Sequence, residues 1–329
     1  NSSLYGLPRP ITTVRHAATY LGLNTVANLA LGFAVIRSFG GNGGESFDQR
    51  RFWQHSLLTA MAGRQLGILL AAEQAEDDFC RGLLHDIGAL ALAQAWPARY
   101  TQVRQTMRER AWPDFEAEAD VFGCDHLAVG SRLVEVWNLP PAFSVPIAHH
   151  HHPHRLPPAE HGQATATHIL YLAGGMARML GGAVDPRTEW EALEEALEGW
   201  GWRERVDLGA VAAAVAGQAR EVLPHYDLEL DLEEHLALVE AARQELARRA
   251  LEALQEVHGQ RREIDRLSQR INRDGMTQLL NHAFFQDLLA QEMGRCRRSR
   301  RPLALLLADI DPFKAVNDTH GHLVGEPVI

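Results

Sequence analysis

Histidine and aspartate side chains that could share a metal ion occur at several separate places along this chain. The sharpest of them is a His85-Asp86 pair inside the apolar stretch Leu83-Leu84-His85-Asp86-Ile87-Gly88. Burying both side chains is unfavourable unless each finds a polar partner, and a divalent ion bound by imidazole and carboxylate would supply one. A hydrogen bond between the two side chains at a helix end is the alternative, and the dipeptide alone favours it.

Further histidines strengthen the metal hypothesis. The chain has 17 histidines. His55 lies upstream in a stretch with helical spacing of apolar residues, His126 precedes Gly130 by four positions, and residues 149–152 are four histidines in a row. A solvated histidine run without a ligand role is the alternative. If the metal hypothesis holds, the fold must bring these distant side chains together.

The region that carries these residues is predicted to be all-helical. From Thr12 to about Pro224, apolar residues recur at three- and four-residue spacing. Breakers rich in glycine or proline separate successive segments, as at 40–44, 139–141 and 181–182. Alternating patterns typical of strands are nearly absent.

The stretch 231–273 has a different character, with few breakers and dense charge. A heptad repeat places its core positions at 236, 239, 243, 246, 250, 253, 257, 260, 264, 267 and 271. All are apolar except Arg243 and Gln260, which is typical of a coiled coil. We therefore expect a homodimer through the 236–271 helix, with alanines making the interface modest. A long helix packed on its own domain is the alternative.

The last segment is predicted to begin an α/β domain. A helix at 283–296 and a basic turn at 295–301 precede an apolar run, 303–308, with a further helix expected from Pro312. We expect the sheet to remain incomplete at Ile329. The predicted fold class is therefore mainly α: an all-helical domain, a long connector helix and a short α/β fragment at the C-terminus.

Composition narrows the possible classes of protein. The 329 residues are 46% hydrophobic and 22% charged, as in soluble globular proteins. No apolar run approaches the roughly 20 residues of a membrane span, and the first residues lack a secretory pattern. The net charge of −10 argues against nucleic-acid binding, and three cysteines without a CxxC motif suit a reducing compartment. We expect a cytoplasmic protein that binds neither nucleic acid nor membrane.

The order of the candidate ligands resembles that of the HD superfamily of metal-dependent phosphohydrolases, most closely its HDOD branch. Asn1-Ser2-Ser3-Leu4-Tyr5-Gly6 with Ile11-Thr12 is similar to the "NSxxYG…ITS" segment of HDOD domains, and Trp137-Asn138-Leu139-Pro140 to their "WxLP" segment. The likeness covers 1–230 and implies a helical HD-type domain whose first helices are missing. The metal ligands that it implies are His55, His85, Asp86, His126, His150 and His151. Four consecutive histidines leave the last pair uncertain by one position.

Two departures from the superfamily argue against hydrolysis. The position of a final ligand aspartate, after Leu172-Ala173, is Gly174, which has no ligating side chain. The Gly-Tyr-Pro loop of the related HD-GYP phosphodiesterases is absent as well. The resemblance therefore implies a divalent metal, with Fe, Mn, Zn and Mg left open, and no catalysis.

The C-terminal segment resembles the beginning of a GGDEF domain, the diguanylate cyclase domain. Residues 274–281 are similar to its "DxLTGLxN" opening, and 307–326 to "DIDxFKxxNDxxGHxxGD". By resemblance Asp309 would bind Mg²⁺, Asn317 would read the guanine edge, and Glu326 would stand where a guanine-contacting aspartate is usual. The signature loop would follow residue 329, so we expect this chain itself not to make cyclic di-GMP.

These segments together predict a bacterial signal-transduction regulator. An HDOD sensory or relay module (1–230) would receive input from an upstream signalling domain or protein. A coiled-coil helix (231–273) would couple it to a truncated GGDEF domain (274–329) of the cyclic di-GMP output type. The alternative is an active HD phosphohydrolase or phosphodiesterase that acts on a nucleotide or cyclic dinucleotide. An inert scaffold with a surface histidine cluster is a third possibility.

Overall fold

The structure is a computed structural model that describes residues 47–275 and 277–306. Within these ranges the chain forms helices joined by short turns, and the only β pairing is an isolated antiparallel bridge between Arg273 and Leu280. The prediction of a mainly α protein is confirmed. The segment 1–12 and the predicted nucleotide-site residues Asp309, Asn317 and Glu326 lie outside the described residues.

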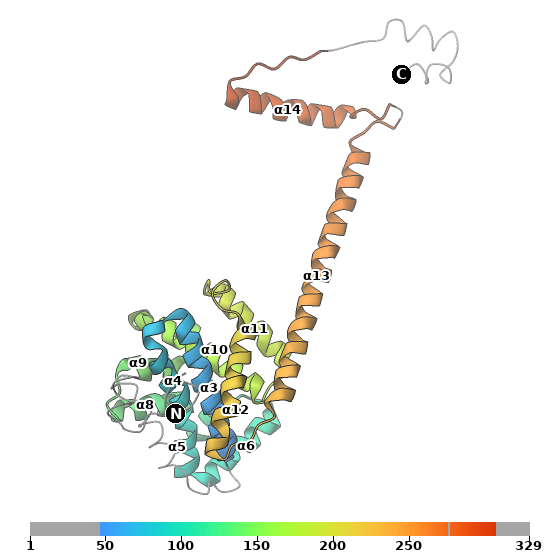
Figure 1. Cartoon of the computed structure of the whole chain (residues 1–329). Helices are drawn as coiled ribbons and strands as arrows, with labels where there is room; N and C mark the ends of the chain where they lie inside the picture. Colours follow the sequence, from blue (N-terminus) through green and yellow to red (C-terminus); the bar gives the residue numbers. More distant parts are fainter. Residues whose placement is uncertain (1–46, 276, 307–329) are drawn as a thin grey trace, which may run out of the picture. The chain divides into compact units, whose positions relative to one another are not determined.

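The centre of the helical domain is the long helix α3 (Gln49–Leu70), which packs against α4 (Ala75–Leu84) and α10 (Ala164–Leu180) (Figure 1). Asp48 caps the start of α3 by accepting a hydrogen bond from the Arg51 backbone N–H. The core side chains of α3 recur at helical spacing and are fully buried, among them Leu58, Met61 and Leu66. Helix α3 therefore forms the centre of the domain, against which the other two helices pack.

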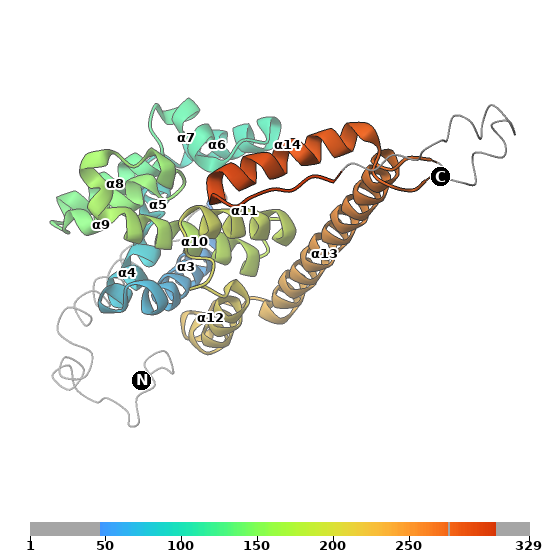
Figure 2. The ribbon, with the colours of Figure 1, turned by 90° about the horizontal axis from the view of Figure 1, so that it is seen from above.

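The remaining helices of this domain surround that centre. They are α5 (Ile87–Ala95), α6 (Pro97–Arg110), α7 (Asp114–Phe122), α8 (His126–Val136), α9 (Pro141–His149), α11 (Pro186–Gly199) and α12 (Leu208–Val222). Short 3-10 turns connect them at Ala72–Gln74, Pro153–Arg155, Pro158–Gln163 and Leu223–Tyr226. Helices α8 and α9 lie side by side (Figure 2). A second small apolar cluster, which includes Leu92, Tyr100 and Ala117, joins α5, α6 and α7.

Glycines allow close contact between the helices that meet around the His85-Asp86 pair. A Cβ on Gly82 of α4 would lie 2.6 Å from the carbonyl oxygen of Thr59 on α3. A Cβ on Gly88 of α5 would overlap the carbonyl oxygen of His126 and lie 2.7 Å from the backbone nitrogen of Gly130 on α8. Helices α5 and α8 therefore touch backbone to backbone, which a larger side chain would prevent.

Helix α13 (Leu232–Ile271) confirms the long connector helix. The chain divides into two compact units between Leu246 and Ala247, so the division falls within this helix and not at its start. In the first unit, Leu232 and Val239 are buried against the helical domain, and Leu236 and Leu246 pack partly on it. The expectation of a helix packed on its own domain therefore holds for the first part of α13.

In the second unit, the described residues of the "DxLTGLxN"-like segment, 274–275 and 277–281, lead into α14 (His282–Ser299). Asp274 accepts hydrogen bonds from the backbone and hydroxyl of Thr277, and Asn281 caps α14 by accepting one from the Phe284 backbone N–H. Residues 303–306, the described part of the apolar run that was expected to form a strand, have no regular structure. No helix among the described residues is long and apolar enough to cross a membrane.

Candidate metal centre

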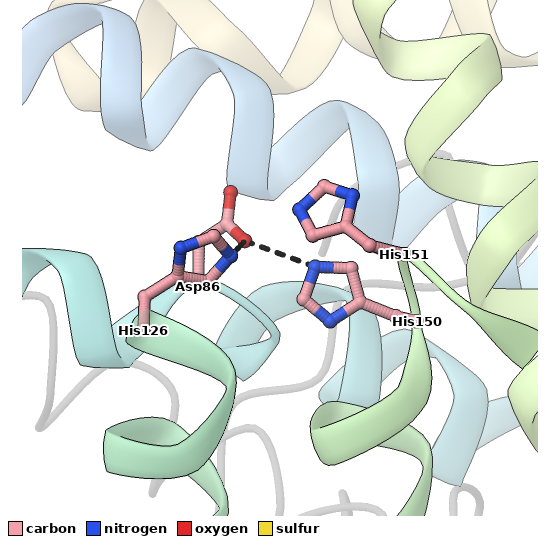
Figure 3. Close-up of side chains that lie close together, drawn as sticks. All are labelled: Asp86, His126, His150 and His151. Carbon is pink, nitrogen blue, oxygen red and sulfur yellow. Dashed lines mark ion pairs between the residues drawn. The ribbon is translucent and has the colours of Figure 1, made fainter. Parts of the chain in front are cut away.

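The predicted ligands converge from helices far apart in the sequence. His55 lies on α3, His85 and Asp86 occupy the break between α4 and α5, and His126 is the first residue of α8. His150 and His151 directly follow the end of α9. Two groups have their possible ligand atoms within 4.8 Å of one another: Asp86, His126, His150 and His151 form the first (Figure 3), and His55, His85 and Asp86 form the second. We call the two groups together the histidine cluster.

Asp86 belongs to both groups because its two oxygens face different histidines. Oδ1 lies 3.3 Å from His150 Nε2 and 3.5 Å from His126 Nε2. Oδ2 lies 3.1 Å from His85 Nε2 and 3.7 Å from His55 Nε2. A single carboxylate thus connects the groups and could serve a cation in either one.

Two of the histidines are oriented by the helices that precede them. The Nδ1–H of His85 donates to the carbonyl of Gly82 at 2.8 Å, and that of His150 donates to the carbonyl of Ile147 at 2.9 Å. This places a proton on Nδ1 of each ring and leaves Nε2 facing the histidine cluster. Metal-binding histidines commonly have this arrangement.

His126 is oriented by Glu118, a residue of α7 that the sequence analysis did not identify. Glu118 is fully buried, and its Oε2 accepts from both the backbone N–H and the ring Nδ1 of His126, each at 2.7 Å. Its Oε1 accepts from the Tyr100 hydroxyl at 2.9 Å. The sequence held one signal for it, since Glu118 lies at helical spacing between Phe115 and Phe122 on the apolar side of α7.

Several ligand-type atoms of the cluster lack a hydrogen-bond partner although they are buried. They are Asp86 Oδ1 and the Nε2 atoms of His126, His150 and His151. Each unsatisfied buried polar atom costs about 1–3 kcal/mol, so such atoms are rarely left together without a shared partner. The residues present therefore fit a divalent cation.

The imidazoles of His55 and His150 are held in the neutral form that a metal requires. Burial, together with the smaller effect of nearby His85, lowers the pKa of His55 to about 3. Burial likewise lowers the pKa of His150 to about 4, against an opposing effect of Asp86. Both rings are thus unprotonated at neutral pH and offer a lone pair.

In contrast to His55 and His150, Asp86 and His126 are held in their charged forms by neighbouring side chains. Burial alone would raise the pKa of Asp86, but the neighbouring His85 and His150 hold it well below its usual value, so the group is ionised. Burial alone would lower the pKa of His126, but the Glu118 carboxylate raises it to about 10. Without a metal, His126 is therefore a cation between two carboxylates.

The run of four histidines separates into members of the cluster and outer residues. His150 and His151 belong to the cluster, whereas His149 Nε2 faces Glu160 at 3.5 Å and the His152 ring contacts Phe115 and His154. Solvent reaches the cluster at His55 and Asp86, whose side chains are 23% and 16% exposed.

A guanidinium group occupies the space beside Gly174. A Cβ on this glycine would lie 3.5 Å from Nη1 of Arg178, one helical turn further along α10. The other Nη of Arg178 donates to Glu189 at 2.5 Å. A positive charge thus lies beside the position at which the resemblance predicted a last carboxylate ligand.

A buried arginine connects α4, the helix that ends just before His85, to α9, the helix that ends at His149. Arg81 is 1% exposed and pairs with the equally buried Asp78 of the same helix. Its Nε donates to the carbonyl of Ala142 on α9 at 2.7 Å, and its guanidinium lies over the Phe143 ring. This contact relates the positions of α4 and α9, and with them His85 and His150.

Comparison with known families supports the two resemblances. The HDOD domain family matches residues 1–153, and the family of the diguanylate cyclase GGDEF domain matches residues 271–329. The probable diguanylate cyclase DgcC of Escherichia coli K12 is 45% identical over 64 residues, which are 20% of this chain and 17% of DgcC. The diguanylate cyclase DosC of the same strain is 36% identical over 59 residues, which are 18% of this chain and 13% of DosC. The chain thus spans less than a fifth of the length of these relatives.

Solved structures support the fold of the helical part. A protein from Shewanella amazonensis SB2B that has been proposed to be a phosphohydrolase is 23% identical, with a TM-score of 0.52 over 71% of this chain and 80% of its own. An HDOD domain protein of unknown function from Geobacter sulfurreducens is 24% identical, with a TM-score of 0.50 over 66% of this chain and 78% of its own. At this level of identity the likeness concerns the fold alone.

Proposed function

We propose that this chain, in which an HDOD domain precedes the beginning of a GGDEF domain, is a bacterial signal-transduction regulator. The HDOD domain binds a divalent metal and relays an upstream signal to a cyclic di-GMP output domain. The order of the two matched domains supports the relay. The diguanylate cyclase relatives, which align only with the C-terminal segment, support the nature of the output.

The observation that supports the metal proposal is the set of buried ligand atoms that face one another without a hydrogen-bond partner. We assign one ion to Asp86, His126, His150 and His151, and a second position to His55, His85 and Asp86. The imidazole-rich set suits Zn, Fe or Mn better than Mg, which prefers oxygen ligands. Since the ligands come from α3, the α4–α5 break, the start of α8 and the residues after α9, metal binding ties these elements together and links metal occupancy to the packing of the domain.

Elemental analysis by mass spectrometry tests this proposal on protein that has never met a nickel column. We expect stoichiometric Zn, Fe or Mn in the purified chain and its loss in His85→Ala. The control is His154→Ala, because His154 is exposed and lies outside the histidine cluster. The assignment would be contradicted if the protein took up none of these three metals, or if the His85→Ala variant kept its metal.

For the output domain, we propose that Asp309 binds Mg²⁺ and that Asn317 and Glu326 contact guanine once the domain is complete. The dimer through α13 would bring two such domains together. In a longer chain with the complete domain, breaking the heptad repeat with Ile264→Lys should reduce cyclic di-GMP synthesis. Equal synthesis by both proteins would contradict the relay.

A metal-dependent phosphohydrolase is the second candidate, because the two ligand groups share Asp86 as two-metal hydrolytic sites share a bridging carboxylate. Gly174, with Arg178 beside it, is the feature against it. Hydrolysis of bis(p-nitrophenyl) phosphate by protein loaded with Mn²⁺ or Fe²⁺ distinguishes the two. Turnover that disappears in Asp86→Asn would establish the enzyme, and no turnover in fully loaded protein would exclude it for this substrate class.

A further inference from the structure

One face of helix α13 has two different environments along its length. In the first compact unit, Val239 is 3% exposed and Leu236 and Leu246 pack partly on the helical domain. In the second unit the described large apolar residues at the heptad core positions of this helix are exposed, and they include Val257, Ile264 and Leu267. We call residues 232–246 the proximal segment and residues 247–271 the distal segment.

Two close side-chain contacts at glycines hold the proximal segment on the helical domain. The ring of His235 fills the space left by Gly182, where a Cβ would lie 2.5 Å from Nε2, and Gly182 has a φ of +66°. The guanidinium of Arg243 lies over Gly209 of α12, where a Cβ would lie 2.6 Å from Nη1. The first contact is made with the turn after α10, and the second is made with α12. Both α10 and α12 pack against α3.

The proximal and distal segments share one heptad repeat. Leu236, Val239 and Leu246 are core positions of the same repeat that continues through Val257, Ile264 and Leu267. A side chain buried against its own domain cannot also fill a hole on a partner helix. While the proximal segment is docked, only the distal segment is available for pairing, which leaves about three heptads that begin with Ala250 and Ala253.

We propose that the proximal segment is a latch that limits the coiled coil between two copies of this chain. In the docked state the partner copy pairs with the distal segment alone. Release from the helical domain transfers Leu236, Val239 and Leu246 to the dimer and extends the coil to about five heptads. The partner is a second copy, because the exposed face continues the repeat and is flanked by both Glu and Arg. This inference rests on the dimer of the proposed function and adds how the helical domain controls it.

Cysteine cross-linking of the full chain tests the latch. Cys124→Ser and Cys296→Ser remove the partly accessible cysteines, while Cys80 is buried and stays. Single cysteines are then placed at Ile264 in the distal segment, at Val239 in the proximal segment, and at Leu238 as a control that is 50% exposed and off the heptad core. On oxidation, we expect covalent dimers from Ile264→Cys and few from Val239→Cys or Leu238→Cys.

Two substitutions open the latch from different sides. Gly182→Val displaces the His235 ring, and Gly209→Leu displaces Arg243. In either background we expect cross-linking through Val239→Cys to rise at least fivefold, and cross-linking through Leu238→Cys to stay unchanged. Circular dichroism checks that each variant is folded, and the use of two independent sites guards against a local defect at one of them.

The outcomes separate the latch from the dimer. If Ile264→Cys gives no dimer, the coiled coil fails, and the proposed function fails with it. If Ile264→Cys gives dimers but Val239→Cys cross-links equally well before the latch is opened, the latch alone is overturned. The same holds if neither Gly182→Val nor Gly209→Leu increases cross-linking at Val239.

Discussion

Replacing Glu118 with glutamine tests how a buried carboxylate prepares the histidine cluster. Glu118 is not itself a predicted ligand, yet it accepts both the backbone and the ring hydrogen bond of His126. Glutamine keeps the shape and one acceptor oxygen, but it removes the charge and turns an amide N–H₂ toward a group that also donates. The change therefore isolates the orientation and charge that Glu118 gives to His126.

The expected size follows from these contacts. Partners that orient a metal-binding histidine are worth about 10- to 100-fold in metal affinity, which is about 1.4–2.8 kcal/mol. Without the charged acceptor, the protein should also release fewer protons when it binds the metal. With a pKa of about 10, His126 is protonated at pH 8 and must lose a proton to bind metal through Nε2. In Glu118→Gln that pKa falls, so a smaller share of the molecules has a proton to release.

Isothermal titration calorimetry of metal-free protein with Zn²⁺ measures both quantities. Titrations at pH 8 in buffers of different ionisation enthalpy give the number of protons released, about one more for the original chain than for Glu118→Gln. The control is Glu160→Gln, which alters a partly exposed carboxylate 3.5 Å from His149 outside the cluster. If Glu118→Gln keeps the affinity within about twofold and releases as many protons, the role assigned to Glu118 is refuted.

Three further predictions concern stability and are measured by urea denaturation of metal-free protein. Gly88→Ala should lower the free energy of unfolding by about 1–3 kcal/mol because its Cβ would overlap the backbone of α8. The control, Gly217→Ala on the open side of α12, should be neutral or stabilising. Equal effects of the two substitutions would contradict the close-contact argument. Arg81→Met should cost about 3–5 kcal/mol by leaving Asp78 buried without its cation, and adding Asp78→Asn should restore part of the loss; no recovery would show that the cost lies elsewhere. The pKa of His55 is about 3 in the fold and near 6.5 in the unfolded chain, so its contribution is present above pH 6.5 and is lost as pH falls toward 3. His55→Gln should therefore make stability less dependent on pH in that window, and an unchanged slope would count against the shift.

Local patterns predicted the helices well because helix periodicity is a property of neighbouring residues. The mainly α class and the long helix after residue 231 are confirmed, and both matched families agree with the resemblances. The ligand roles of the histidines remain predictions, although the structure brings the residues together as the family order implies.

What the sequence could not supply depends on contacts between distant segments. Glu118 precedes His126 by eight positions on another helix, and only the fold shows that their side chains meet. Arg81 likewise lies on α4, yet it donates to the carbonyl of Ala142 on α9, 61 positions further along the chain. The heptad repeat of α13 reports an apolar face but not which partner covers it, so Val239 fits a dimer seam and a domain surface equally well.

The hydrogen bonds from His85 to Gly82 and from His150 to Ile147 have a consequence for interpreting other sequences. Both carbonyls belong to the last turn of a helix, α4 and α9 respectively, where backbone acceptors lack intrahelical donors. Each imidazole therefore closes a helix end whether or not an ion is present. A descendant that had lost its metal would still gain stability by keeping these two histidines. Their retention in a sequence is thus weak proof of metal binding, and the inward-facing Asp86 and the Glu118 behind His126 are the more informative residues to inspect.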